Sequence, residues 1–273
     1  MRKSERQRVR ESVTLKRMPT RLFLSPHLDD AALSCGGLIH KHAQQADRIV
    51  VVTVCAGDAP ASELSPFAES LHARWKTPNE VVAVRRAEDL AATQVLGAEA
   101  IHWDVPDCIY RTDPATGAHL YTSEESLFGE WHIAEWPLAQ RLAQSIMELC
   151  RLLHAEALYA PLTIGHHVDH QLVRRAAELT RLPLVYYEDY PYAARESEIE
   201  LWGGLAQGPD DDHALSPERV IFAEPDLEAK CQAIAAYASQ ISTFWAEESA
   251  LWAAIRQFAE RQRAGQLAER VWK

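Results

Sequence analysis

The chain has 273 residues, 47% of them hydrophobic, so it is long enough to bury a sizeable core. Its net charge is −11, and only residues 1–21 are basic, with eight Lys or Arg against two Glu, while the remainder carries 20 against 37. A body this acidic repels nucleic acid and anionic lipid. No apolar run is long enough for a membrane-spanning helix.

We expect residues 1–19 to form a flexible basic arm, because they are polar and lack the apolar segment of a secretory signal. The scattered cysteines include no C-x-x-C pair, which predicts buried free thiols rather than disulfides or a structural zinc site. The lack of a secretory signal favours the cytoplasm. The cysteines are Cys35, Cys55, Cys108, Cys150 and Cys231.

Short apolar runs alternate with longer amphipathic stretches through most of the chain. Strands are predicted at 22–24, 48–55, 100–103, 157–160 and 184–187. Helices are predicted at 31–45, 80–96, 138–154 and 168–180. This alternation predicts one α/β domain over residues 20–273, Rossmann-like, with a mostly parallel sheet and helices on both faces.

Three segments interrupt the alternation, at about 57–79, 105–137 and 190–217. Insertions of this length in a compact domain are usually functional, so we expect them to act as lids or walls of a site. After the third insertion, residues 219–222 are predicted to add a strand. The rest of the chain is predicted to be helical, with helices at 226–244 and 247–264 that pack back on the domain.

The first chemical motif is Ser25-Pro26-His27-Leu28-Asp29-Asp30, directly after the first strand. Ligands bind at the carboxyl ends of parallel strands, so a site is expected here. His27 and Asp30 share a turn, and an imidazole nitrogen with a carboxylate oxygen suits Zn²⁺. Asp29 is left free to take a proton. The alternative is that Asp29 and Asp30 only cap the first helix.

The second motif is His166-His167-Val168-Asp169-His170, which follows the strand at 157–160. Asp169 is expected to accept an N–H from a histidine ring and so fix its tautomer, in the second shell of a metal site. The alternative is a polar helix start with solvated histidines.

The two motifs together predict a catalytic metal site at the carboxyl ends of the first and fifth strands. His27, Asp30 and His170 supply three ligands and leave one position open. Asp29 and His167 remain as an acid/base pair around a water molecule that the metal activates. These are the parts needed to hydrolyse an amide.

Both motifs resemble those of the PIG-L-type (LmbE-like) N-acetylglucosaminyl deacetylases, which have the forms H-P-D-D-E and H-x-D-H. Here the proline and glutamate are replaced by Leu28 and Ala31, neither of them a metal ligand in the family pattern. Arg85-x-x-Glu88 and the segment 186–192 also resemble family sequences, so the likeness covers about residues 20–192.

The resemblance implies hydrolysis of the N-acetyl amide of an amino-sugar conjugate, with one Zn²⁺ per chain or Fe²⁺ in its place. It repeats the ligand and acid/base assignments, and adds Arg85 and Asp107 as substrate contacts. Arg85 and Glu88 could instead form a surface ion pair on a helix. Tryptophans in the insertions either stack on sugar rings or pack the lids. These are Trp131, Trp136 and Trp202.

Two other functions remain open at this point. One is a metal-dependent amidohydrolase for a non-sugar acyl amide, and the other is an inactive binding module with the same fold. A nucleotide-binding Rossmann protein is disfavoured because no G-x-G-x-x-G follows the first strand. The expected partner is a small N-acetylated sugar conjugate rather than nucleic acid or membrane, and the sequence leaves homo-oligomer formation open.

Overall fold

The computed structural model describes residues 18–61, 63–75, 81–195, 215–245 and 247–273. Most of the predicted basic arm and Trp202 therefore lie outside the described residues. Within the described ranges, no helix is both long enough and apolar enough to cross a membrane.

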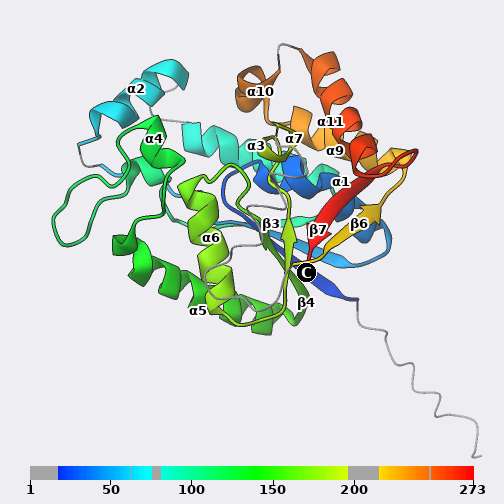
Figure 1. Ribbon diagram of the computed structural model, residues 1–273, viewed down its shortest axis with the longest axis horizontal. Coiled ribbons are helices and arrows are strands. Elements are labelled where there is room, and N and C mark those ends of the chain that lie inside the picture. The colour runs from blue at the N-terminus through cyan, green and yellow to red at the C-terminus, as the bar shows by residue number, and fades with distance from the viewer. Residues whose placement is uncertain (1–17, 62, 76–80, 196–214, 246) are drawn as a thin grey trace, which may run out of the picture.

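A seven-stranded, mostly parallel sheet forms the centre of the molecule, in the order β3-β2-β1-β4-β5-β7-β6 (Figure 1). The five parallel strands are β1 (Thr20–Ser25), β2 (Arg48–Thr53), β3 (Glu99–His102), β4 (Ala155–Pro161) and β5 (Leu184–Tyr187). Strand β7 (Ala268–Trp272) runs antiparallel between β5 and β6 (Pro217–Ile221). The predicted α/β class is confirmed.

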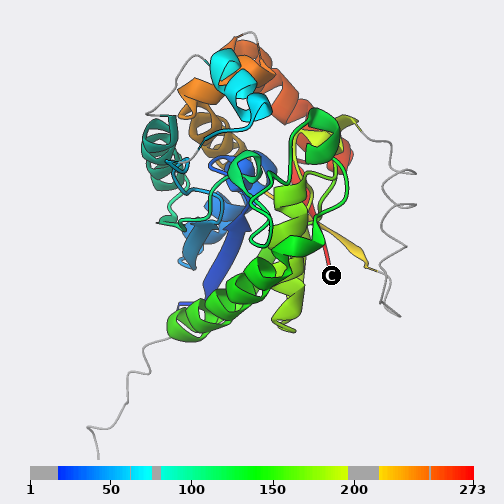
Figure 2. The ribbon, with the colours of Figure 1, turned by 90° about the vertical axis from the view of Figure 1, so that its left-hand side faces the viewer.

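Helices cover both faces of this sheet because alternate strand residues point to opposite sides. Leu22 and Val50 face α5 (Trp136–Leu153) and α6 (Val168–Leu179). Phe23 and Val51 face the other layer, which contains α1 (Asp30–Gln44), α3 (Val81–Val95) and α9 (Glu224–Ala235). Figure 2 turns the view by 90° and shows the same layers edge-on.

Helix α1 packs against the C-terminal part of the chain through a small-residue face. A Cβ on Gly36 would lie 2.9 Å from Cγ of Lys230 on α9, and one on Gly37 would lie 2.9 Å from the ring of Phe222. Glycine is therefore required for this close approach. The contact holds the helix that carries Asp30 against α9.

The first two insertions contain short helices and share a small hydrophobic core with α6. The first contains α2 (Pro66–Trp75), and the second contains η1 (Cys108–Tyr110), α4 (Glu124–Leu127) and η2 (Ile133–Glu135). Leu71, Ile109, Leu127 and Val168 bury their side chains together in this core. The described part of the third insertion contains α7 (Tyr192–Arg195).

Two predictions for the C-terminal part were wrong. The helix predicted at 226–244 is two helices, α9 and α10 (Ala238–Phe244), because the chain breaks at Tyr237, whose buried hydroxyl donates to Asp89 on α3 at 2.7 Å. No strand was predicted after 264, but β7 follows α11 (Glu248–Gln262). Its charged residues Glu269 and Arg270 are buried in ion pairs.

The remaining predicted strands and helices are present, and their ends differ from the predicted ones by at most two residues. The prediction of free thiols is confirmed, since all of the cysteines are unpaired and buried. One detail of the predicted site location is corrected. The strand that precedes His166 is β4, the fourth strand in the chain rather than the fifth.

Candidate active site

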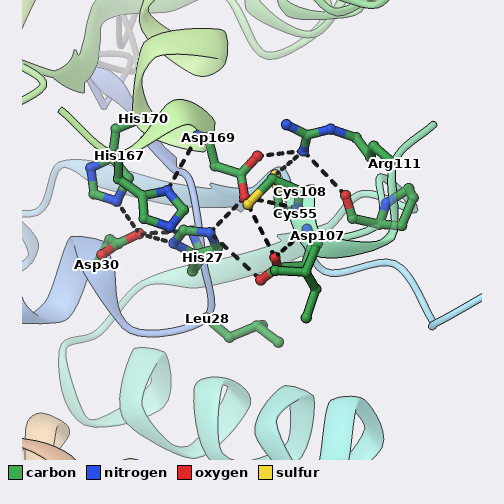
Figure 3. Close-up of polar contacts among 12 residues, drawn as sticks. His27, Leu28, Asp30, Cys55, Asp107, Cys108, Arg111, His167, Asp169 and His170 are labelled. Carbon is green, nitrogen blue, oxygen red and sulfur yellow. Dashed lines mark hydrogen bonds and ion pairs between the residues drawn. The ribbon is translucent and has the colours of Figure 1, made fainter. Parts of the chain in front are cut away.

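The two motifs meet where the strand order reverses. Strands β1 and β4 are neighbours at the centre of the parallel sheet, and β2 and β5 extend it in opposite directions. This switch point leaves a crevice at the carboxyl ends of the strands in open α/β sheets. His27 follows β1 and the 166–170 motif follows β4, so both motifs project into this position (Figure 3).

The turn after β1 is held in one conformation by Ser25. Its hydroxyl donates to the His27 carbonyl at 2.7 Å and accepts from the Ala31 backbone N–H at 3.0 Å. Asp29 lies just before α1 with φ 149°, where side-chain-bearing residues are strained. The Asp29 side chain makes no capping hydrogen bond, so its carboxylate is not used to cap the helix.

Asp30 lies between two imidazole rings. Its Oδ2 is 3.1 Å from His27 Nδ1 and 3.3 Å from His170 Nε2. Tetrahedral bonds of about 2.0–2.1 Å to Zn²⁺ separate ligand atoms by roughly 3.3 Å. Both nitrogen–oxygen distances therefore suit a shared ion, and the donor types suit Zn²⁺.

Other donor groups lie beside these three residues. One ligand atom from each of His27, His167 and His170 lies within 4.8 Å of the other two. Two further groups with the same spacing overlap with this one, namely Cys108 with His167 and Asp169, and His27 with Asp107 and Asp169. The site is therefore one continuous cluster of metal-binding groups.

Opposite charges in the cluster stabilise the charged forms of His27, His170 and Asp30. Burial lowers the pKa of His27, but hydrogen bonds to Asp169 and Asp30 outweigh burial and hold this pKa well above its usual value. Burial likewise lowers the pKa of His170, but the charge of Asp30 and a hydrogen bond to Asp189 raise it to about 10. Burial would raise the pKa of Asp30, yet the charge of His170 keeps it well below its usual value.

Asp29 has different surroundings from Asp30. It is buried, and burial raises its pKa to about 7. Its nearest cation is Arg85, whose Nη2 lies 3.5 Å from Oδ2 of Asp29. Asp29 and Asp30 are therefore neighbours in the chain but have different surroundings at the start of α1.

His167 caps the start of α6, where its Nδ1 accepts the Asp169 backbone N–H at 3.3 Å. Its ring lies edge-on to the rings of His27 and Phe128, with centroids 4.9 Å and 5.4 Å away. Burial lowers the pKa of His167 to about 4. The ring is therefore neutral in these surroundings and lies at the edge of the cluster.

The residues around the cluster orient its imidazoles. Asp169 Oδ2 lies 2.9 Å from His27 Nε2, and Asp189 Oδ1 lies 2.6 Å from His170 Nδ1. The second oxygen of Asp189 accepts the Ile164 backbone N–H at 2.9 Å. Each ring therefore has one nitrogen bound to a fixed carboxylate and the other directed at Asp30.

The structure also brings Arg85 and Asp107 to the site. Arg85 donates to the Leu28 carbonyl at 3.2 Å, in addition to its contact with Asp29. Glu88 instead accepts from the backbone of Ser239 at 2.8 Å, so it is not the ion-pair partner shown for Arg85. Asp107 Oδ2 lies 3.9 Å from His27 Nε2.

Trp131 and Trp136 lie near each other, with ring centroids 6.1 Å apart. Trp131 is partly buried against the core that underlies α5 and α6. These contacts show packing within the second insertion.

Sequence reasoning missed Arg111, Glu135 and Asp189. Arg111 forms buried ion pairs with both Asp169 and Glu135, and Asp189 holds His170. No spacing rule links Arg111 to a motif 58 residues away. The acidic pair in the segment 186–192, directly after a strand, was the available signal for Asp189.

The chain is similar to known proteins in sequence and in fold. Residues 22–180 match the PIG-L family, described as GlcNAc-PI de-N-acetylase. The 2'-N-acetylparomamine deacetylase of Niallia circulans is 27% identical over 197 residues, which cover 65% of this chain and 69% of that protein.

Two solved structures are similar over nearly the whole chain. The zinc-inhibited form of teicoplanin deacetylase is 27% identical with a TM-score of 0.78, covering 93% of this chain and 97% of that one. The A40926 pseudoaglycone deacetylase is 30% identical with a TM-score of 0.73, covering 92% and 95%. Each of these relatives is named as a deacetylase.

Proposed function

The chain belongs to the PIG-L family of GlcNAc-PI de-N-acetylases, and on that premise we propose that it hydrolyses the N-acetyl amide of an amino-sugar conjugate to a free amine and acetate. The metal would be one zinc ion per chain, held by His27, Asp30 and His170. One observation carries the proposal. Nitrogens of His27 and His170 converge on Asp30 Oδ2, with Asp29 and His167 beside them.

A bound divalent ion supplies Lewis acidity, which activates water and polarises the amide carbonyl. Asp29 accepts the proton of the attacking water, a role supported by its buried carboxylate, which is not used to cap α1. His167 donates a hydrogen bond to the carbonyl oxygen in its neutral form, or takes up a proton and passes it to the leaving amine, as its place at the edge of the cluster allows. The C–N bond breaks as the amine nitrogen gains its proton.

The substrate class is supported by the relatives, which act on 2'-N-acetylparomamine, teicoplanin and the A40926 pseudoaglycone. All are named as deacetylases. Arg85 on α3, before β3, and Asp107, after β3, both lie at the site and are proposed to contact the sugar. The expected partner is thus a small acetylated sugar conjugate.

A hydrolysis assay tests the proposal. Zinc-loaded protein is incubated with N-acetylglucosamine glycosides and 2'-N-acetylparomamine, and free amine and acetate are measured. N-acetylated amino acids serve as the non-sugar comparison. We expect sugar substrates to be cleaved, a chelator to abolish the activity, and zinc or Fe²⁺ to restore it.

Two results would contradict the proposal. Cleavage of only the amino-acid amides would assign the site to a non-sugar amidohydrolase, and binding of the sugars without turnover would indicate an inactive binding module. Full activity in metal-free protein would overturn the metal assignment.

A further inference from the structure

Arg111 is buried between two carboxylates next to the active site. Only 6% of its surface is exposed, and it follows η1 in the second insertion. Its guanidinium pairs with Asp169 through Nη1 (Figure 3) and also with Glu135 through Nε. A buried guanidinium must be matched by carboxylates, and these two supply that compensation.

The contact with Asp169 leads directly to His27. Arg111 binds Oδ1 of Asp169, while Oδ2 faces His27 Nε2 at 2.9 Å and accepts the Cys108 backbone N–H at 3.2 Å. The two oxygens have separate partners, so Asp169 cannot rotate without losing one of them. His27 Nε2 is thereby held on Asp169, and Nδ1 is left facing Asp30 at 3.1 Å.

The other end of Arg111 is anchored in the second insertion. Glu135 Oε2 accepts from the Tyr121 hydroxyl at 2.6 Å, and the Tyr121 oxygen accepts the His132 backbone N–H at 3.0 Å. Arg111 also donates to the carbonyl of Pro106, at 3.3 Å. Pro106 directly precedes Asp107, so the same guanidinium holds the segment that brings Asp107 to the site.

We propose that Arg111 is a positioning residue that acts through Asp169 to hold the His27 ring in the orientation that binds the metal. This inference rests on the proposed function only in taking His27 as a metal ligand. Arg111 touches neither the metal nor the substrate. It connects the second insertion to the metal site through the path Tyr121–Glu135–Arg111–Asp169–His27.

A lysine should not replace Arg111. The guanidinium fork places separate N–H groups on Glu135, Asp169 and the Pro106 carbonyl at once. One ammonium on a flexible stem lacks this planar geometry. Arg111→Lys keeps the charge but should loosen Asp169 and with it the His27 ring.

The test measures metal affinity, with Zn²⁺ and a competing chromophoric chelator as the probe. Partners of metal ligands typically contribute about 10–100-fold to metal affinity, so Arg111→Lys should bind Zn²⁺ weaker by about that factor. At saturating Zn²⁺, kcat should fall more than KM rises. The absorption spectrum of the Co²⁺-loaded variant should also change, because the His27 ligand is displaced.

The control is Arg21→Lys, which alters an Arg–Asp47 pair at the amino end of β1, the strand that leads to His27. It should leave Zn²⁺ affinity unchanged. A second comparison combines Arg111→Lys with Asp169→Asn. Because Arg111 acts through Asp169, the double variant should bind Zn²⁺ no more weakly than Asp169→Asn alone.

The outcomes separate this inference from the proposed function. If the unaltered protein binds no Zn²⁺, the metal assignment itself fails. If it binds Zn²⁺ and folded Arg111→Lys binds equally well, or if the double variant shows additive losses, the positioning role is wrong. Should Arg111→Lys not fold, Tyr121→Phe decides. A severalfold weaker Zn²⁺ affinity supports the role, and unchanged affinity overturns it.

Discussion

Asp29 and Asp30 are identical side chains with separate partners. Asp30 lies between two imidazoles, which stabilise its charged form, whereas Asp29 is buried with Arg85 at 3.5 Å as its nearest cation. Burial raises the pKa of Asp29 to about 7, so its carboxylate is more basic than an ordinary aspartate. The surroundings of the two residues therefore suit one to a cation and the other to a proton.

The pair gives a prediction at the residue scale. Asp29→Ala should retain its zinc while turnover falls about 10² to 10⁴-fold, because a general base is lost. Asp30→Ala should lose zinc and regain part of its activity in excess metal, because a ligand is lost. Zinc content and turnover are measured for both variants. Loss of zinc in Asp29→Ala with retention in Asp30→Ala would reverse the assignments.

At the scale of elements, the loop from β4 to α6 controls where the second motif lies. Gly165 has φ +88°, and a Cβ there would lie 2.4 Å from the ring of Tyr192 on α7. The Tyr192 ring in turn packs edge-on against His170, with centroids 6.1 Å apart. The loop can therefore adopt this conformation against Tyr192 without strain only with glycine at this position.

Replacing this glycine should destabilise the protein. Gly165→Ala is expected to cost about 2–4 kcal/mol, since backbone strain and overpacking against Tyr192 both contribute. The free energy of unfolding is measured by chemical denaturation. Gly117 is a matched control, because it has φ +73° with no atom within 4 Å of a Cβ.

Gly117→Ala should lower the free energy of unfolding by about 1 kcal/mol, because only the positive φ is unfavourable for alanine there. Equal losses in the two variants would show that the contact with Tyr192 is not limiting.

At the scale of the whole molecule, the sheet is completed by strand β7, close to the C-terminal end of the chain. It lies between β5 and β6, and Trp272 is fully buried, with its indole N–H donating to Glu188 at 3.0 Å. Arg270 of the same strand forms an ion pair with Glu188, next to Asp189. The last strand thus supports the segment that holds His170.

Trp272→Ala should lower the free energy of unfolding by about 3–5 kcal/mol, because it leaves a large cavity in the core. Leu152→Ala is the control, since Leu152 on α5 is 74% exposed and its removal should change stability by less than about 0.5 kcal/mol. Both values come from the same denaturation experiment. A loss below about 1 kcal/mol for Trp272→Ala would mean that β7 contributes little to the fold.

Local patterns in the sequence were enough to predict the α/β class and the positions of most elements. The β-branched run of β2 predicts a buried strand, and the periodicity of α5 and α6 predicts amphipathic helices. The residues of both chemical motifs could also be named, because ligand types at helical spacing, each after a strand, form a local signal. Their roles remain predictions.

Other features were decided only by tertiary structure, because they depend on residues far apart in the chain. Strand β7 has buried charged residues, and ion pairs with Lys230 and Glu188 make those positions favourable. Tyr237, at the break between α9 and α10, donates to Asp89, 148 residues away. The role of Arg111 likewise follows from its contacts with Asp169 and Glu135, which are distant in the chain. The sequence by itself determined which groups can carry the chemistry, whereas the packing of the insertions decided which of them are held in place, because burial creates partners that no local spacing encodes.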